Sequence, residues 1–143
     1  MSGWEIFNTD HWHVTHRRDS RYPGYLIVSP ALAASEMADL SDGALEKLGG
    51  VLKRCETLLK KAYNCYKVII YRFGFSPGLN LHFHVVPVML KLLSEIGAHP
   101  NYSEVPDGND TVLFLSREYC ERPLTPDEQM LQDQAIRTLK NLI

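Results

Sequence analysis

Two histidines one residue apart, His82 and His84, are the residues of this sequence best suited to chemistry. They lie in segment 79–87, whose aromatic and β-branched residues predict a strand. Successive side chains of a strand point to opposite faces, so Asn80, His82 and His84 should share one face. A solvated face of an antiparallel sheet would accept them. However, a His-x-His pair beside an asparagine, in a segment otherwise fit for burial, favours an active site.

Such a pair can perform two kinds of chemistry. In the first, one imidazole attacks phosphorus and forms a phosphoramidate, while its neighbour donates a hydrogen bond to a phosphate oxygen. In the second, both imidazoles bind zinc together with a third protein ligand. The histidines available as that third ligand are His11, His13, His16 and His99. No His-Glu-x-x-His or paired-cysteine motif supports a zinc site, so we expect no bound metal.

The elements that position the pair are predicted from apolar patterns and turn residues. Strands are expected over the segments 11–16, 25–28, 66–73, 79–86 and 111–115. Pro23 and Gly24 form a turn between the first two strands, which predicts a hairpin. A loop containing two glycines, 74–78, joins the next two strands into a second hairpin.

Helices are predicted between and after these hairpins. Ser41 is a plausible cap for an amphipathic helix that runs to about Ala62. A short helix is expected over 89–96. The last helix begins at Thr125, where Glu128 completes a capping box. Strands, helix, strands and helix in this order predict a mainly antiparallel α+β domain.

Composition restricts the class of protein. The chain has 143 residues, of which 45% are hydrophobic and 22% charged, as expected for one globular domain. A net charge of −2 gives no general attraction to nucleic acid or to an anionic membrane. Three cysteines without close pairing, and the lack of a signal peptide or bilayer-length apolar run, lead us to expect a cytoplasmic protein.

The histidine strand resembles a known signature. The run LNLHFHVVP at 79–87 is similar to His-φ-His-φ-His-φ-φ of the histidine-triad (HIT) superfamily, with Asn80 at the first histidine position. The hairpin at 16–30, with its Pro-Gly turn, resembles the family's earlier hairpin. This resemblance spans about 11–88. It implies one HIT-like domain over 1–143, with about five strands, a long helix after the first hairpin and a C-terminal helix.

The resemblance also implies an activity. The resemblance implies a hydrolase that acts at the α-phosphate of nucleotide phosphoanhydrides or phosphoramidates, with dinucleoside polyphosphates such as diadenosine tetraphosphate as the leading substrates. His82 would attack and hold the nucleotidyl group until water releases it. His84 would hydrogen-bond phosphate oxygens, and the backbone carbonyl of Asn80 would orient the His82 ring. Tyr25 stands where many relatives have a histidine near the leaving group.

Further contacts to nucleotide are expected on two loops. The family's ribose contacts lie on the first hairpin, which suggests His16, Arg17 and Asp19, although turn and surface roles are equally open. The loop before the signature could offer backbone N–H groups and a hydroxyl to phosphate, which suggests Ser76 and Gly78, although an ordinary turn is also open.

The remaining expectations concern partners and alternatives. The resemblance implies a homodimer with joined sheets, a nucleotide substrate, and no tightly bound cofactor, although Mg²⁺ can accompany the substrate. One alternative is a zinc-dependent hydrolase that uses the His-x-His pair. The other is a non-catalytic nucleotide-binding regulator that kept the pocket after losing the histidine at position 80 and the leaving-group residue at position 25.

Overall fold

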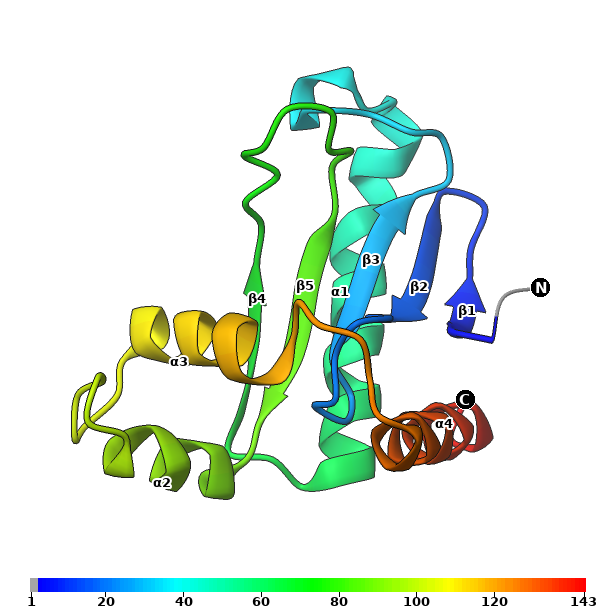
Figure 1. Cartoon of the computed structure of the whole chain (residues 1–143). Helices are drawn as coiled ribbons and strands as arrows, with labels where there is room; N and C mark the ends of the chain where they lie inside the picture. Colours follow the sequence, from blue (N-terminus) through cyan, green and yellow to red (C-terminus); the bar gives the residue numbers. More distant parts are fainter. Residues whose placement is uncertain (1–2) are drawn as a thin grey trace.

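Five antiparallel strands form one sheet in the computed structural model, which describes residues 3–143 (Figure 1). The strand order across the sheet is β1-β2-β3-β5-β4. The strands are β1 (Glu5–Asn8), β2 (Trp12–His16), β3 (Leu26–Pro30), β4 (Lys67–Tyr71) and β5 (Phe83–Val88). Both predicted hairpins, β2–β3 and β4–β5, are confirmed, and pairing of β3 with β5 joins them.

Four α-helices accompany the sheet: α1 (Asp42–Tyr63), α2 (Leu90–Ala98), α3 (Gly108–Phe114) and α4 (Pro126–Asn141). The hydroxyl of Ser41 accepts a hydrogen bond from the Ala44 N–H and caps α1 as predicted. Thr125 and Glu128 form the predicted capping box of α4. Within residues 3–143, no helix has both the length and the apolar character needed to cross a bilayer.

The helices cover both faces of the sheet. Helix α1 packs behind it, and α3 lies in front (Figure 1). Alternate residues of β5 follow this division: Val85 is buried in the core beneath α1, and Val86 is buried in a second core with α2 and the segment after α3. Because both faces are covered, a polar side chain on β5 lies among buried residues. His84 is such a side chain, with 9% of its surface exposed.

One predicted strand is wrong, and one observed strand was not predicted. Segment 111–115 belongs to α3 and its π-helical continuation, not to a strand. Its β-branched and aromatic residues suggested a strand, but Asp107 and Asp110 form a capping box that starts a helix. The fifth strand is instead β1, which pairs antiparallel with β2.

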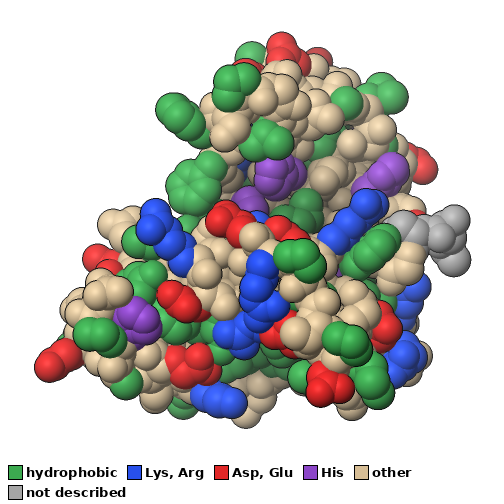
Figure 2. Space-filling model, in the orientation of Figure 1, with side chains coloured by type: hydrophobic (Ala, Val, Ile, Leu, Met, Phe, Trp, Pro, Cys, Tyr) green, Lys and Arg blue, Asp and Glu red, His purple; other side chains and the backbone are tan. Residues whose placement is uncertain are grey.

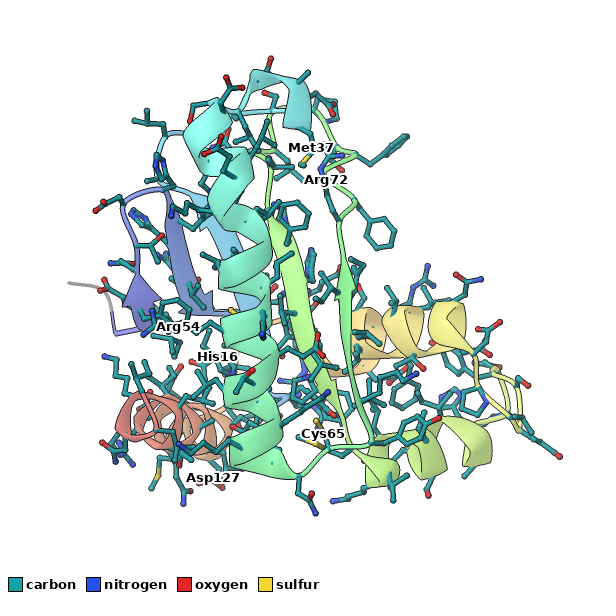
Figure 3. The ribbon with its side chains drawn as sticks, turned by 180° about the vertical axis from the view of Figure 1, so that it is seen from behind. His16, Met37, Arg54, Cys65, Arg72 and Asp127 are labelled. Atoms are coloured by element: carbon teal, nitrogen blue, oxygen red, sulfur yellow. The ribbon has the colours of Figure 1, made fainter. Side chains whose placement is uncertain are left out.

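Strand β5 begins four residues later than predicted and does not end at Pro87. The segment before it is attached to a neighbouring loop: the Leu81 N–H donates to the Ala34 carbonyl at 2.6 Å. Arg72 also reaches this loop and donates to a Glu36 carboxylate oxygen at 2.8 Å, which agrees with the position of Arg72 near Met37 in Figure 3. His82 therefore lies just before the strand, and the loop at 34–36 supports it.

A buried glutamine fixes the chain after β2. Gln132 of α4 is 2% exposed, and its amide NH₂ donates to the carbonyl oxygens of Arg17, Arg18 and Ser20 at 2.9–3.1 Å. Its amide oxygen accepts from the Trp4 indole N–H at 3.1 Å. The C-terminal helix thereby holds in place the segment that presents two arginines.

Candidate active site

The two histidines lie at a pocket of about 670 Å³. Its lining includes His82, His84, Asn80, Arg17 and Arg18. Figure 2 shows histidine side chains in a hollow of this face with Lys or Arg side chains beside them. No carboxylate belongs to the lining, so the charged groups at this pocket favour an anionic ligand.

His82 is held in one tautomer. Its Nδ1 lies 2.9 Å from the backbone carbonyl oxygen of Asn80. A carbonyl oxygen only accepts hydrogen bonds, so Nδ1 must be the protonated nitrogen of the neutral ring. Nε2 makes no hydrogen bond within residues 3–143 and keeps its lone pair, which is the requirement for attack on phosphorus. The backbone of Asn80, not its amide, makes this contact.

His84 lies between two tyrosines. In the sheet it stands opposite Tyr71 on one side and Ile27 on the other. Its ring stacks on the Tyr71 ring with centroids 4.5 Å apart and planes at 5°. Its Nδ1 lies 2.7 Å from the Tyr25 hydroxyl. The His82 and His84 rings are 4.9 Å apart, so one phosphate can reach both.

Tyr25 is the centre of this arrangement. It is fully buried, and its hydroxyl contacts His84 Nδ1, the Tyr71 hydroxyl and an Arg17 N–H, the last at 2.9 Å. A second Arg17 nitrogen donates to Asp19 at 2.7 Å. Arg17 therefore connects the pocket to the residues beneath His84.

The same surroundings control protonation. Burial, with repulsion from His82 and Arg17, lowers the pKa of His84 to about 3. Burial raises the pKa of Tyr25 and of Tyr71. At neutral pH the three rings are therefore uncharged.

The position of His16 does not agree with the contact to nucleotide that was predicted for it. It is fully buried beside α1 in the body of the molecule (Figure 3). Its Nδ1 donates to the Arg17 carbonyl at 2.9 Å, and its Nε2 accepts from the Gly24 N–H at 3.1 Å. No ring nitrogen is left for a ligand. His16 instead connects the two ends of the turn between β2 and β3.

Of the other residues predicted to contact nucleotide, only one lines the pocket. Arg17 lines the pocket, but Asp19 does not; it pairs with Arg17. Ser76 and Gly78 are exposed and lie outside the pocket lining. The Ser76 carbonyl closes a local turn by accepting from the Leu79 N–H at 3.3 Å, and Gly78 takes a φ of 82°. In this structure the loop is an ordinary turn outside the pocket, and its contact to phosphate stays a prediction.

Three residues at the site were not predicted from the sequence: Arg18 in the lining, Tyr71 against His84, and Gln132 behind the arginines. Tyr71 could have been found from the sequence, because counting residues along the predicted β4–β5 hairpin indicates which residue of β5 lies opposite it. Gln132 had none, since its contacts are 112–115 residues away along the chain.

Buried neutral histidines should make the fold sensitive to acid. Burial lowers the pKa of His16 from 6.5 to about 4, so between these values the unfolded chain binds a proton that the folded chain does not. The free energy of unfolding must then fall as pH falls. Urea titrations at pH 7 and pH 5 should show a loss that is smaller in His16→Gln by about 1.5–2 kcal/mol. An equal loss in both proteins would contradict this assignment.

No family model matches the sequence, and no curated protein matches it. Solved structures do match, over nearly the whole chain. A HIT-like protein involved in cell-cycle regulation from Bartonella henselae superposes with a TM-score of 0.66 at 14% identity, covering 98% of this chain and 86% of that one. The chain has the histidine-triad fold.

Two further structures share this histidine-triad fold. A histidine triad protein from Bradyrhizobium japonicum gives a TM-score of 0.65 at 21% identity and covers 97% of this chain and 89% of its own. A diadenosine triphosphate hydrolase from Plasmodium falciparum gives 0.64 at 8% identity, with coverages of 99% and 76%. The predicted fold, α+β with a five-stranded antiparallel sheet, is thus confirmed.

Proposed function

We propose that this protein hydrolyses nucleotide phosphoanhydrides or phosphoramidates at the α-phosphate through a nucleotidyl-His82 intermediate. The observation that supports this most is the 2.9 Å contact between His82 Nδ1 and the Asn80 carbonyl, which leaves Nε2 as a free nucleophile in the pocket. His84 stands beside it and can bind a phosphate oxygen.

The reaction has two steps. The lone pair of His82 Nε2 forms a bond to the α-phosphorus, and the bond from phosphorus to the leaving oxygen or nitrogen breaks, so the leaving group takes that electron pair. Water then attacks the same phosphorus. The N–P bond breaks, its electron pair returns to Nε2, the water protons pass to product and solvent, and a mononucleotide leaves.

Charge in the pocket supports substrates with several phosphates. Arg17 and Arg18 both belong to the lining, and the Arg18 guanidinium lies over the Trp4 ring, 4.5 Å from its centroid. Arg17 is paired with Asp19, but no ion pair engages Arg18 within residues 3–143. Guanidinium is well suited to phosphate oxygens. We therefore keep dinucleoside polyphosphates, such as diadenosine tetraphosphate, as the leading substrate class, with Mg²⁺ entering only on the substrate.

A zinc hydrolase is less well supported by these residues. Zinc sites of this kind take three protein ligands. In the part of the chain that the structure describes, no three His, Cys, Asp or Glu side chains come together in a way that could hold a metal ion. His11, His13, His16 and His99, the candidate third ligands, do not line the pocket of His82 and His84.

We also infer a homodimer in the cytoplasm. Strand β4 lies at the edge of the sheet, so one side of its backbone is unpaired. Beside it lies a groove that includes Ile70, Phe73 and Leu113, all exposed. A second copy that pairs β4 with β4 would cover this edge and groove.

The experiment that tests the proposed function is a substrate panel. The protein is incubated with adenosine and guanosine polyphosphates, dinucleoside polyphosphates and nucleoside phosphoramidates, and released mononucleotide is measured by chromatography. Release from at least one class is expected, and its loss in His82→Ala is the matched control. Tight binding of these compounds without release would favour the nucleotide-binding regulator instead.

The Asn80→His variant, which restores the family's histidine, should change the rate of an already active protein only modestly. The contact that orients His82 comes from the backbone of residue 80, which the Asn80→His variant retains. A histidine adds a titratable charge at the pocket, worth about 1.4 kcal/mol or less in the barrier. We therefore expect turnover within about tenfold of the parent. An inactive parent that becomes active on Asn80→His would mean a disabled site.

A further inference from the structure

The hydroxyl groups around His84 have one arrangement in which each hydroxyl hydrogen finds an acceptor within residues 3–143. The Tyr25 hydroxyl has one hydrogen and two lone pairs. Arg17 can only donate, so it occupies one lone pair. If Tyr71 donates into the other, the Tyr25 hydrogen is directed at His84 Nδ1. If Tyr25 donated to Tyr71 instead, the Tyr71 hydrogen would have no acceptor among residues 3–143, where Tyr25 is its only hydrogen-bond partner.

This arrangement decides the tautomer of His84. When Nδ1 accepts from Tyr25, the neutral ring must have its proton on Nε2. That nitrogen makes no hydrogen bond within the described chain, and the residue lines the pocket. An N–H at this position can donate to a phosphate oxygen, whereas a bare lone pair would repel it.

The surroundings also oppose a second proton on His84. The Tyr71 ring covers one face of the imidazole, and Tyr25 approaches from the loop before β3. Two groups that repel an imidazolium, His82 and Arg17, face it, while Asp19 attracts one. Cys120 lies near both tyrosines. Burial outweighs the attraction of the single carboxylate.

We propose that Tyr25 and Tyr71 are positioning residues, which keep His84 a neutral imidazole with its N–H on the pocket side, so that it binds phosphate as a fixed hydrogen-bond donor and transfers no proton. This inference rests on the proposed function for its kinetic consequence, but the state of His84 is a property of the free protein. The neutral donor makes phosphate binding by His84 independent of pH from about 5 to 8, because it does not titrate there.

The direct test is nitrogen-15 NMR of the histidine rings in the protein without substrate. Wild-type His84 should show a protonated Nε2 and an unprotonated Nδ1 from pH 5 to 8. In Tyr25→Phe the donor to Nδ1 is gone, so both tautomers of the neutral ring should appear. Tyr22→Phe is the control, because the Tyr22 hydroxyl donates to the Pro87 carbonyl on the same sheet but outside this network. It should leave the His84 signals unchanged.

Kinetics give the second measurement. On a substrate that the parent hydrolyses, Tyr25→Phe should lower kcat about tenfold with little change in KM. Tyr71→Phe, at a half-buried position, should show the same changes to a smaller degree and serves if Tyr25→Phe does not fold.

The outcomes separate the two proposals. A wild-type His84 that has its proton on Nδ1, or that titrates above pH 5, would overturn the positioning role whatever the activity. The role is also wrong if both tyrosine variants keep the wild-type tautomer. Absence of turnover in the parent, with the expected NMR signals, would count against the hydrolase alone.

Discussion

His82→Ala should lower turnover by about 10⁴-fold or more, because it removes the atom that bonds to phosphorus. The side chain is partly exposed and makes one hydrogen bond, to its own local backbone, so its removal should barely affect folding. Single-turnover rates with the best substrate of the panel measure the effect, and thermal unfolding verifies the fold.

A matched control is His13→Ala, since His13 is an exposed histidine on β2 that does not line the pocket. It should retain parental rates. Near-parental turnover by His82→Ala would mean that His82 is not the nucleophile and is a binding residue at most.

His84→Ala should have the second-largest effect, a loss in kcat of roughly 10²–10³-fold. Removal of one preorganised donor to a developing oxyanion costs about this much in other hydrolytic sites. The variant also leaves the buried Tyr25 hydroxyl without its acceptor, so some stability should be lost. His84→Gln is the informative companion, because its amide can still donate into the pocket and should recover part of the rate.

The two variants separate the roles of the histidines. A covalent intermediate should still form slowly in His84→Ala and should not form in His82→Ala. If His84→Ala were as inactive as His82→Ala under single-turnover conditions, the assignment of a nucleophile and a separate donor would be wrong.

The elements that could be predicted are those with local signals. Ser41 and Thr125 start helices through side-chain caps within three residues, and Pro23 with Gly24 marks the turn of the first hairpin. Strand β1 has only four residues and depends on β2 for its hydrogen bonds, so its own residues give little signal. Helix α3 was missed because its cap outweighs the β-propensity of the residues that follow.

The site shows the same division. Its backbone contact at Asn80 lies two residues from His82 and follows from the signature. The bond between Tyr25 and His84 joins residues 59 positions apart, and no pattern along the chain contains it. His16 illustrates the opposite error: a polar residue on the hairpin suggested a ligand contact, yet both of its ring nitrogens are used inside the protein.

A nucleotide should become bonded to His82 during turnover, and trapping that species tests the mechanism most directly. The protein is mixed with excess substrate, quenched in base within the first turnover, and digested for mass spectrometry; His84→Ala is included to slow the reaction. The expected result is a peptide with His82 heavier by one nucleoside monophosphate less water, absent in His82→Ala. Turnover with no such adduct in either active protein, or an adduct on another residue, would contradict the account.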